Sequence, residues 1–197
     1  MRPGDRSVDP IRRFQSWFAQ AARAGERRPE EMALATADRR GAPAVRYVLL
    51  RGIDERGFVF YTDGRSRKGA EIRANPRAAL ALYWGGTGKQ VRIEGAIEEV
   101  EPELVDAYWA RRSREKRLAA ASSRQDAPLA RRADLLERFR ALRALYRAKE
   151  LPRPAAWTGF RVIPDTIEFW IRRAHRLHHR ELFVRRAGVW RRRLLQP

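Results

Sequence analysis

The stretch "AALALYWGGTGKQVRIEGAIEEV", residues 78–100, contains two apolar segments joined by a short glycine-rich link. Residues 78–84 and 89–100 favour strands, and the "GGTG" between them is typical of a turn. The stretch therefore predicts a β-hairpin, and similar pairs of strand and turn recur along the chain.

A phosphate-binding loop is the competing interpretation of "GGTGKQ". Such a loop needs a glycine five positions before Gly88 and a serine or threonine after Lys89. Tyr83 and Gln90 stand there instead, so this interpretation is rejected. The chain also lacks G-x-G-x-x-G, which leaves a doubly wound dinucleotide-binding domain without support.

Strand-like segments lie on both sides of the hairpin. Before it come "MALATAD" (32–38), "AVRYVLLRGI" (44–53) and "GFVFYT" (57–62). After it come "GFRVI", "TIEFWI" and "ELFVRR…VWRRRLL", the last a hairpin about Ala187-Gly188. Many short strands with turn-length links predict an α+β protein built on an antiparallel barrel with peripheral helices.

Helices are expected at the N-terminus and between the strands. Asp9 can cap a first helix within residues 1–30, and Pro10 suits its first turn. A short helix is expected from about Ser66 to Asn75. A helical section follows over 102–150, with one helix from Pro102 and a longer one over 128–150. The longer helix has an apolar stripe of Leu135, Phe139, Leu142 and Tyr146.

The composition limits the class of protein. With 197 residues and 44% hydrophobic residues, the chain suits one domain, 1–197, with a real core. It has no cysteine, so disulfides, thiolate nucleophiles and cysteine-ligated metals are excluded. No signal peptide and no run of about 18 apolar residues is visible, so a soluble cytoplasmic protein without membrane contact is expected.

The net charge of +19 raises the question of nucleic-acid binding. Of the 43 basic residues, 39 are arginine, and they are spread along the whole chain. No zinc-finger spacing, basic region with heptads or aromatic RNA-binding signature is present. Compositional bias is therefore the preferred interpretation, and no nucleic-acid partner is expected. The charge would still steer small anions.

All three histidines, His175, His178 and His179, fall within "EFWIRRAHRLHHRELF" (168–183). A metal site, a nucleic-acid surface, a catalytic strand and chance are the four interpretations. If a strand continues through the cluster, alternation places His178 on one face with Arg176 and Arg180. Arginines beside a histidine repel a cation, so no metal is expected and an anionic or electron-rich ligand fits better.

The segment "SRKGAEIRANP" strengthens the case for an anion. Arg67 and Lys68 stand in the first turn of the helix expected after Ser66, where the helix dipole disfavours cations. They are reasonable there if an anion such as phosphate binds the N-terminal amides. Arg46, in a neighbouring strand, could add a further cation.

Taken in order, "RYVLLR", "FVFYT", "SRK…I…NPR", "KQVRIEG", "IEFW" and "HRLHHR" resemble the pyridoxamine 5′-phosphate oxidases. These are FMN enzymes with a split β-barrel, and the resemblance covers roughly Met32 to Pro197. It implies a homodimer whose C-terminal strands, 157–197, carry substrate and dimer residues. It also implies a two-electron oxidation of a phosphorylated pyridine substrate, with O2 as acceptor and H2O2 as product.

The resemblance also implies roles for individual residues. The implied contacts to FMN are Arg46, Tyr47, Val48, Leu49, Leu50, Arg51, Tyr61, Thr62, Arg67, Lys68, Gln90, Gln125, Trp170 and Arg180, some of them from the second subunit. The implied substrate contacts are Arg51, Tyr108, Arg112, Lys116, Arg176 and His178. Of these, Arg176 and His178 match the pair that holds the substrate's ring over the flavin and are the expected catalytic residues.

Three positions depart from the family pattern. Arg51 stands where the family usually has a lysine, and Lys116 where it has a serine, so both keep the site cationic. Asp126 replaces a serine beside the FMN phosphate, where a carboxylate is unfavourable unless it turns away or pairs with an arginine. In addition, strict alternation puts Arg46 and Arg51 on opposite faces, so a bulge or strand end is expected between them.

Three rivals to a vitamin B6 oxidase stay open. An FMN oxidase of the same fold could act on another substrate, such as a phenazine-pathway intermediate. A split barrel could bind heme or flavin without turnover, although the Arg176–His178 pair argues against this. Nucleic-acid binding rests on charge alone.

Overall fold

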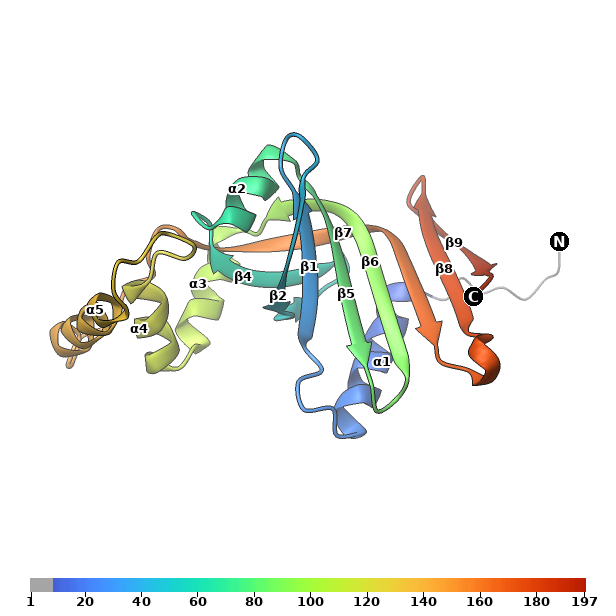
Figure 1. Cartoon of the computed structure of the whole chain (residues 1–197), viewed down its shortest axis with the longest axis horizontal. Helices are drawn as coiled ribbons and strands as arrows, with labels where there is room; N and C mark the ends of the chain where they lie inside the picture. Colours follow the sequence, from blue (N-terminus) through green and yellow to red (C-terminus); the bar gives the residue numbers. More distant parts are fainter. Residues whose placement is uncertain (1–8) are drawn as a thin grey trace.

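The computed structural model describes residues 9–197, which form a curled antiparallel sheet with helices at its periphery (Figure 1). The strand order is β2-β1-β5-β6-β7-β4-β3, and β8 extends the sheet from β7 to β9. The strands are β1 (Glu31–Ala37), β2 (Pro43–Leu49), β3 (Gly52–Ile53), β4 (Phe58–Asp63), β5 (Arg77–Trp84), β6 (Lys89–Glu99), β7 (Trp157–Ile171), β8 (His179–Arg186) and β9 (Val189–Leu195). This confirms the predicted split-barrel class.

The hairpin predicted for residues 78–100 is present. β5 and β6 pair antiparallel from Trp84↔Lys89 to Arg77↔Ala96. Gly88 closes the turn with a φ of +61°, and its N–H donates to the carbonyl oxygen of Gly85. Glycine adopts this left-handed conformation without the steric cost that a side chain brings.

The segment predicted as one strand over 44–53 is divided into β2 and β3. β2 ends at Leu49, and the backbone N–H of Leu50 donates to Glu30 while that of Arg51 donates to Val59. The expected strand end therefore lies between Arg46 and Arg51, and strict alternation does not relate their side chains.

The opposite change occurs at "GFRVI" and "TIEFWI", which form the single strand β7. Its pairing with β6 shifts register between Glu94 and Gly95, opposite Pro164. A Cβ on Gly95 would lie 1.9 Å from the carbonyl oxygen of Ile163. The close approach of the two backbones allows β7 to run unbroken through the curl of the sheet.

Two apolar clusters hold the elements together. In the first, α1 (Pro10–Arg23) packs Phe14 and Trp17 against Phe58 and Phe169 of the sheet. Asp9 caps this helix as predicted, accepting from the N–H of Ile11. Residues 1–8, part of the predicted N-terminal unit, lie outside the described residues.

The second cluster lies at the other end of the sheet, where α3 (Pro102–Arg111) and α4 (Arg114–Ser122) pack on β4 and β7. Its centre is Trp109 and Trp157. α4 was not predicted as a separate helix, and the long helix is shorter than expected, with α5 spanning Arg132–Leu145. The α5 stripe is only partly covered, since Phe139, Leu142 and Tyr146 are half-buried against this cluster.

The predicted strand through the histidine cluster is wrong. β7 ends at Ile171, a 3-10 turn spans Ala174–Arg176, and β8 begins only at His179. His175 and Arg176 have φ values of 55° and 61°, which are incompatible with an extended strand. The argument from alternation therefore does not place Arg176 and His178 on one face.

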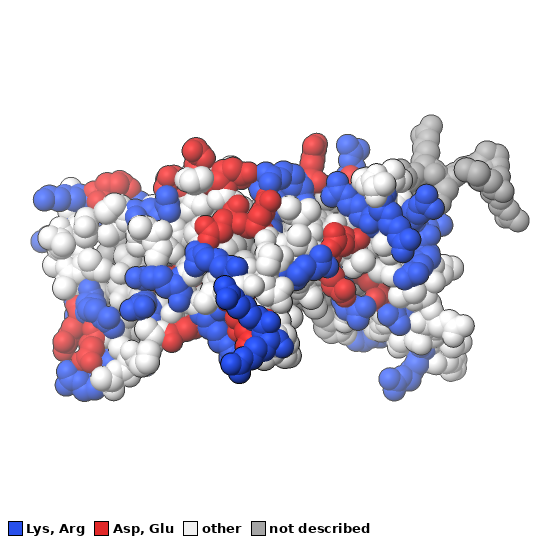
Figure 2. All heavy atoms as spheres, turned by 90° about the horizontal axis from the view of Figure 1, so that it is seen from above, with Lys and Arg blue, Asp and Glu red and all other residues white. Residues whose placement is uncertain are grey.

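The face of the molecule drawn in Figure 2 has side chains of both charge signs. Lysine and arginine side chains are interleaved with aspartate and glutamate on the face shown. The most buried ion-paired arginine, Arg161 of β7, is within 3.4 Å of Asp54, Glu98 and Glu101. Within residues 9–197, no helix is long and apolar enough to cross a membrane.

Candidate active site

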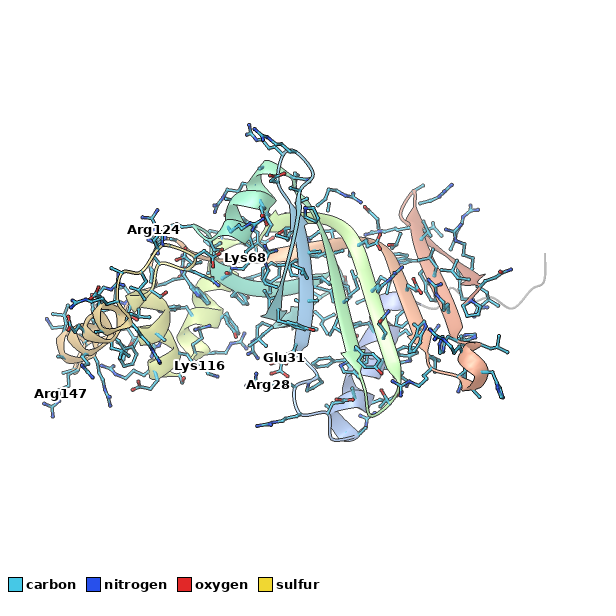
Figure 3. The ribbon with its side chains drawn as sticks, in the orientation of Figure 1. Arg28, Glu31, Lys68, Lys116, Arg124 and Arg147 are labelled. Carbon is cyan, nitrogen blue, oxygen red and sulfur yellow. The ribbon has the colours of Figure 1, made fainter. Side chains whose placement is uncertain are left out.

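A cavity of about 780 Å³ lies between the sheet and the helical section formed by α3 and α4. Eleven of the residues predicted to bind cofactor or substrate line it: Tyr47, Val48, Leu49, Arg51, Tyr61, Thr62, Lys68, Tyr108, Arg112, Lys116 and Gln125. They come from β2, β4, α2 (Arg67–Ala74), α3, α4 and the adjoining loops. In Figure 3, Lys68 is seen on α2 and Lys116 on α4.

One end of the cavity is built at the start of α2. Ser66 caps this helix by accepting from the N–H of Gly69, and the ammonium of Lys68 lies 3.0 Å from the Ser66 hydroxyl and 3.2 Å from that of Thr62. Lys68 is only 3% exposed, and no carboxylate of residues 9–197 lies within ion-pair distance of it. Burial lowers the pKa of Lys68 from its usual value. A buried ammonium without a carboxylate partner is suited to an incoming anion.

Arg46 and Arg67 flank Lys68 but are held by a buried glutamate. Glu71 accepts from Arg46 Nη2 at 3.0 Å, from Arg67 Nε at 2.6 Å and from the Thr36 hydroxyl at 2.5 Å. Burial by itself would raise the pKa of Glu71, but these hydrogen bonds bring it below its usual value. Glu71 thus fixes two predicted phosphate-binding arginines from β2 and α2 next to the cavity.

The other end of the cavity is formed by Arg51, Arg112 and Lys116. The guanidinium of Arg112 lies over the ring of Trp157, 4.9 Å from its centroid, and its Nη2 donates to the carbonyl oxygen of Lys116 at 3.0 Å. Burial lowers the pKa of Arg112, and its Nε has no hydrogen-bond partner within the described part of the chain. Arg51 lies 3.8 Å from Glu30. This end therefore has three cationic side chains, and Glu30 is the carboxylate near them.

Aromatic rings form one wall of the cavity. Tyr61 and Tyr108 stack with centroids 4.0 Å apart and planes 3° apart, and Trp157 lies parallel to both. Burial raises the pKa of Tyr61. Sequence reasoning missed Trp157, together with Arg28 and Arg111, which also line the cavity. No sequence signal separates Trp157 from an ordinary core residue, because its role depends on contact with a helix about fifty positions earlier in the chain.

The remaining predicted residues lie elsewhere. Leu50 is buried in the first cluster, and a second group gathers at the β6–β7–β8 edge of the sheet. There Gln90 pairs with Trp170, and Trp170 pairs with Arg180. None of Gln90, Trp170, Arg176, His178 and Arg180 lines the cavity described above.

His178 belongs to this edge group and is oriented within it. Its ring lies 4.5 Å from that of Trp170, and its Nδ1 accepts from the N–H of Arg173 at 3.3 Å. His179 instead contacts Glu181 at 2.6 Å, and His175 is exposed. No group of three histidine, aspartate or glutamate side chains with the spacing of a metal site occurs among residues 9–197.

The fold and the cavity together define a split-barrel protein with a pocket lined by several lysine and arginine side chains. A family model described as pyridoxamine 5′-phosphate oxidase matches residues 18–171, and one described as the pyridoxine 5′-phosphate oxidase C-terminal dimerisation region matches residues 157–197. The chain belongs to the pyridoxamine 5′-phosphate oxidase family.

Curated relatives agree with this assignment. The chain is 49% identical to the pyridoxine/pyridoxamine 5′-phosphate oxidase of Rubrobacter xylanophilus over 96% of this chain and 87% of the relative. It is 46% identical to that of Anaeromyxobacter dehalogenans over 99% of this chain and 98% of the relative.

Two solved structures are similar over almost the whole chain. PhzG of Burkholderia lata 383, in complex with tetrahydrophenazine-1-carboxylic acid, is 35% identical with a TM-score of 0.93, covering 100% of this chain and 98% of that one. A pyridoxamine 5′-phosphate oxidase-related, FMN-binding protein of Nostoc punctiforme is 21% identical with a TM-score of 0.78, covering 97% and 100%, and supports the fold.

Proposed function

We propose that this chain is an FMN-dependent oxidase that converts pyridoxine or pyridoxamine 5′-phosphate to pyridoxal 5′-phosphate. O2 is the electron acceptor and H2O2 a product, and the amine substrate also takes up water and releases ammonia. Family membership and the curated relatives support this activity. The observation that carries it is that one cavity is lined by Lys68 from α2 and by a second set of cations, Arg51, Arg112 and Lys116. Such a lining supports a site for two phosphate groups, one on the cofactor and one on the substrate.

The residues of the cavity fit FMN at the end formed by α2. The buried ammonium of Lys68 and the first amides of α2 would hold the phosphate, with Arg46 and Arg67 beside them. Thr62 and Gln125, which are hydrogen-bonded to each other at 2.9 Å, lie next to Lys68. Bound FMN supplies the two-electron acceptor, and O2 restores its oxidised form.

The end formed by Arg51, Arg112 and Lys116 would hold the substrate's phosphate. Arg112 can offer a planar guanidinium, and the hydroxyl of Tyr108 is close by in the cavity wall. A site with several cations loses much of its affinity for a ligand that lacks the phosphate, because those cations would then be desolvated without a partner.

Arg176 and His178 would orient the substrate's ring, and they would come from a second copy of the chain. This is supported by the place of the edge group, which is at the opposite end of the sheet from α3 and α4 (Figure 1), and by the match of residues 157–197 to a dimerisation region. In the proposed homodimer, Gln90, Trp170 and Arg180 of one copy approach the cavity of the other.

The related oxidase of a phenazine-type substrate is the second candidate, favoured by the similarity to PhzG over the whole chain. Its substrate would place an aromatic carboxylate, rather than a phosphate, against Arg51, Arg112 or Lys116.

Oxygen uptake by the yellow, FMN-loaded protein decides between the two candidates. We expect pyridoxine or pyridoxamine 5′-phosphate to be oxidised with a kcat/KM at least about 100-fold above that of the unphosphorylated vitamers. Reduction of the flavin by a tricyclic carboxylate alone would overturn the vitamin B6 assignment. Failure of purified protein to take up FMN at all would overturn the whole proposal.

A further inference from the structure

A carboxylate accepts a hydrogen bond from the first backbone amide of α2. The backbone N–H of Arg67 donates to Oδ2 of Asp126 at 2.9 Å. Asp126 lies in the loop between α4 and α5, 59 positions further along the chain.

The surroundings of this amide favour an anion, because a buried ammonium group lies beside it. The next residue, Lys68, is only 3% exposed, and within residues 9–197 its ammonium is hydrogen-bonded to hydroxyl groups alone, those of Ser66 and Thr62. Its pKa is lowered by burial, and Asp126 opposes this shift. Asp126 therefore stands as the nearby counter-charge of a buried cation without forming a direct ion pair with it.

The loop that carries Asp126 has few attachments. Asp126 is exposed and has a φ of 66°, and a turn between Arg124 and Ala127 encloses it. The preceding residue, Gln125, is bound through its N–H to Asp63 and through its side chain to Thr62. In Figure 3, Arg124 marks this loop to the left of Lys68. Rotation at Asp126 can thus free the Arg67 amide without unfolding a helix or strand.

We propose that Asp126 is an internal anion that holds the phosphate end of the cavity when the cofactor is absent and leaves when the phosphate of FMN binds. The inference rests on the proposed function, in which FMN occupies this end. Two negative groups cannot share one amide closely without strong repulsion. Asp126 therefore lowers the affinity for FMN and stabilises the empty protein.

The proposal predicts opposite effects on the affinity for FMN and on the thermal stability of the empty protein. Removing the charge of Asp126 should tighten FMN binding, whereas the empty protein should lose the hydrogen bond at its helix start and unfold at a lower temperature. Riboflavin, which has the same ring system without phosphate, should bind equally well to the wild type and to a variant without the charge of Asp126. A residue that only shapes the loop would alter the binding of both flavins.

The test uses the full-length protein with its flavin removed. Quenching of flavin fluorescence gives the Kd of FMN and of riboflavin for the wild type, Asp126→Asn and Asp126→Ala. Asparagine keeps an oxygen acceptor for the Arg67 amide without the charge, and alanine removes both. Asp134→Asn, on the nearby helix α5 and paired with Arg131, is the matched control.

We expect both variants at 126 to bind FMN about five- to tenfold more tightly than the wild type, with riboflavin changed less than about twofold. The melting temperature of the empty Asp126→Ala protein should fall, and that of Asp126→Asn should fall less. Unchanged or weaker FMN binding in both variants would overturn the inference while leaving the proposed function intact. If the wild type bound neither flavin, the proposed function itself would fail.

Discussion

The cavity end of the molecule and the β6–β7–β8 edge contain similar residue types in contrasting surroundings. In the cavity, Lys68 is almost completely buried, and the guanidinium of Arg112 lies against an indole ring. At the edge, Arg176 is exposed and His178 is half-buried. The difference teaches that one chain encloses the cations of its cavity but leaves the cations and imidazole of its edge group open to solvent. Under the proposed function, the cavity binds the phosphate groups within one copy of the chain, and the edge group is free to complete the site of a second copy.

The strongest challenge to this comparison is a substitution at the edge. We expect His178→Ala to lower kcat/KM by about 100-fold, because misplacing a bound substrate by about 1 Å can cost this much. His175→Ala and His179→Ala are the controls, since His175 is exposed and His179 is bound to Glu181. Steady-state oxygen uptake measures all three, and equal losses in the three variants would contradict a special role for His178.

A hybrid dimer tests whether the two regions meet across subunits. Arg112→Glu damages the cavity and His178→Ala damages the edge, so each homodimer should have little activity. In a hybrid purified through two different affinity tags, one site has both substitutions and the other has neither. We therefore expect about half of the wild-type activity from the hybrid. An inactive hybrid would show that each chain forms its own complete site.

A smaller effect is expected at the aromatic wall of the cavity. Trp157 positions the guanidinium of Arg112, and a cation–π contact of about 0.5–2 kcal/mol corresponds to a change in affinity of up to about thirtyfold. Trp157→Leu should raise the KM for phosphorylated substrate about tenfold and alter kcat little, whereas Trp157→Phe should restore most of the affinity. A loss confined to kcat would contradict this positioning role.

The smallest effect concerns the attachment of the edge to α1. Arg13 donates to Glu181 of β8 at 2.7 Å, and this contact lowers the pKa of Glu181 to about 2 from an ordinary 4.5. Glu181 therefore contributes stability that is present above about pH 4.5 and is lost as the pH falls towards 2. In urea unfolding at pH 6 and pH 3, Glu181→Gln should lose less stability than the wild type on acidification. Glu103→Gln, at an exposed position in the first turn of α3, should behave like the wild type.

Much of the fold could be predicted because its strands are separated by clear turn residues. Helix α4 was missed because only Leu118 and Ser122 of "REKRLAAAS" are buried, which leaves no apolar stripe to detect. The strand through the histidines was predicted wrongly because β-favouring residues on both sides hide the left-handed backbone at His175 and Arg176.

Lys68 could be predicted as part of an anion site from its position in the first turn of a helix. The other cavity residues could be predicted only through the family resemblance, since they come from segments far apart in the sequence. Eleven of the predicted residues, Lys68 included, do line one cavity, which supports their proposed roles. Trp157 was missed because its contact with Arg112 depends on the packing of α3 on β7. The separation of the edge group from the cavity could not be predicted either, because the order of the motifs along the chain does not say how far apart they lie in the fold.

Gly95 shows what such motifs record. It is the last letter of "KQVRIEG", one of the segments that revealed the family, yet its importance is steric, because any side chain there would collide with the backbone at Ile163. A sequence signature of this kind combines residues that contact a ligand with residues that are needed for the curvature of the sheet. A related protein could therefore keep a glycine at the position of Gly95 and still act on a different substrate. A search for residues that determine substrate specificity should give this glycine no weight.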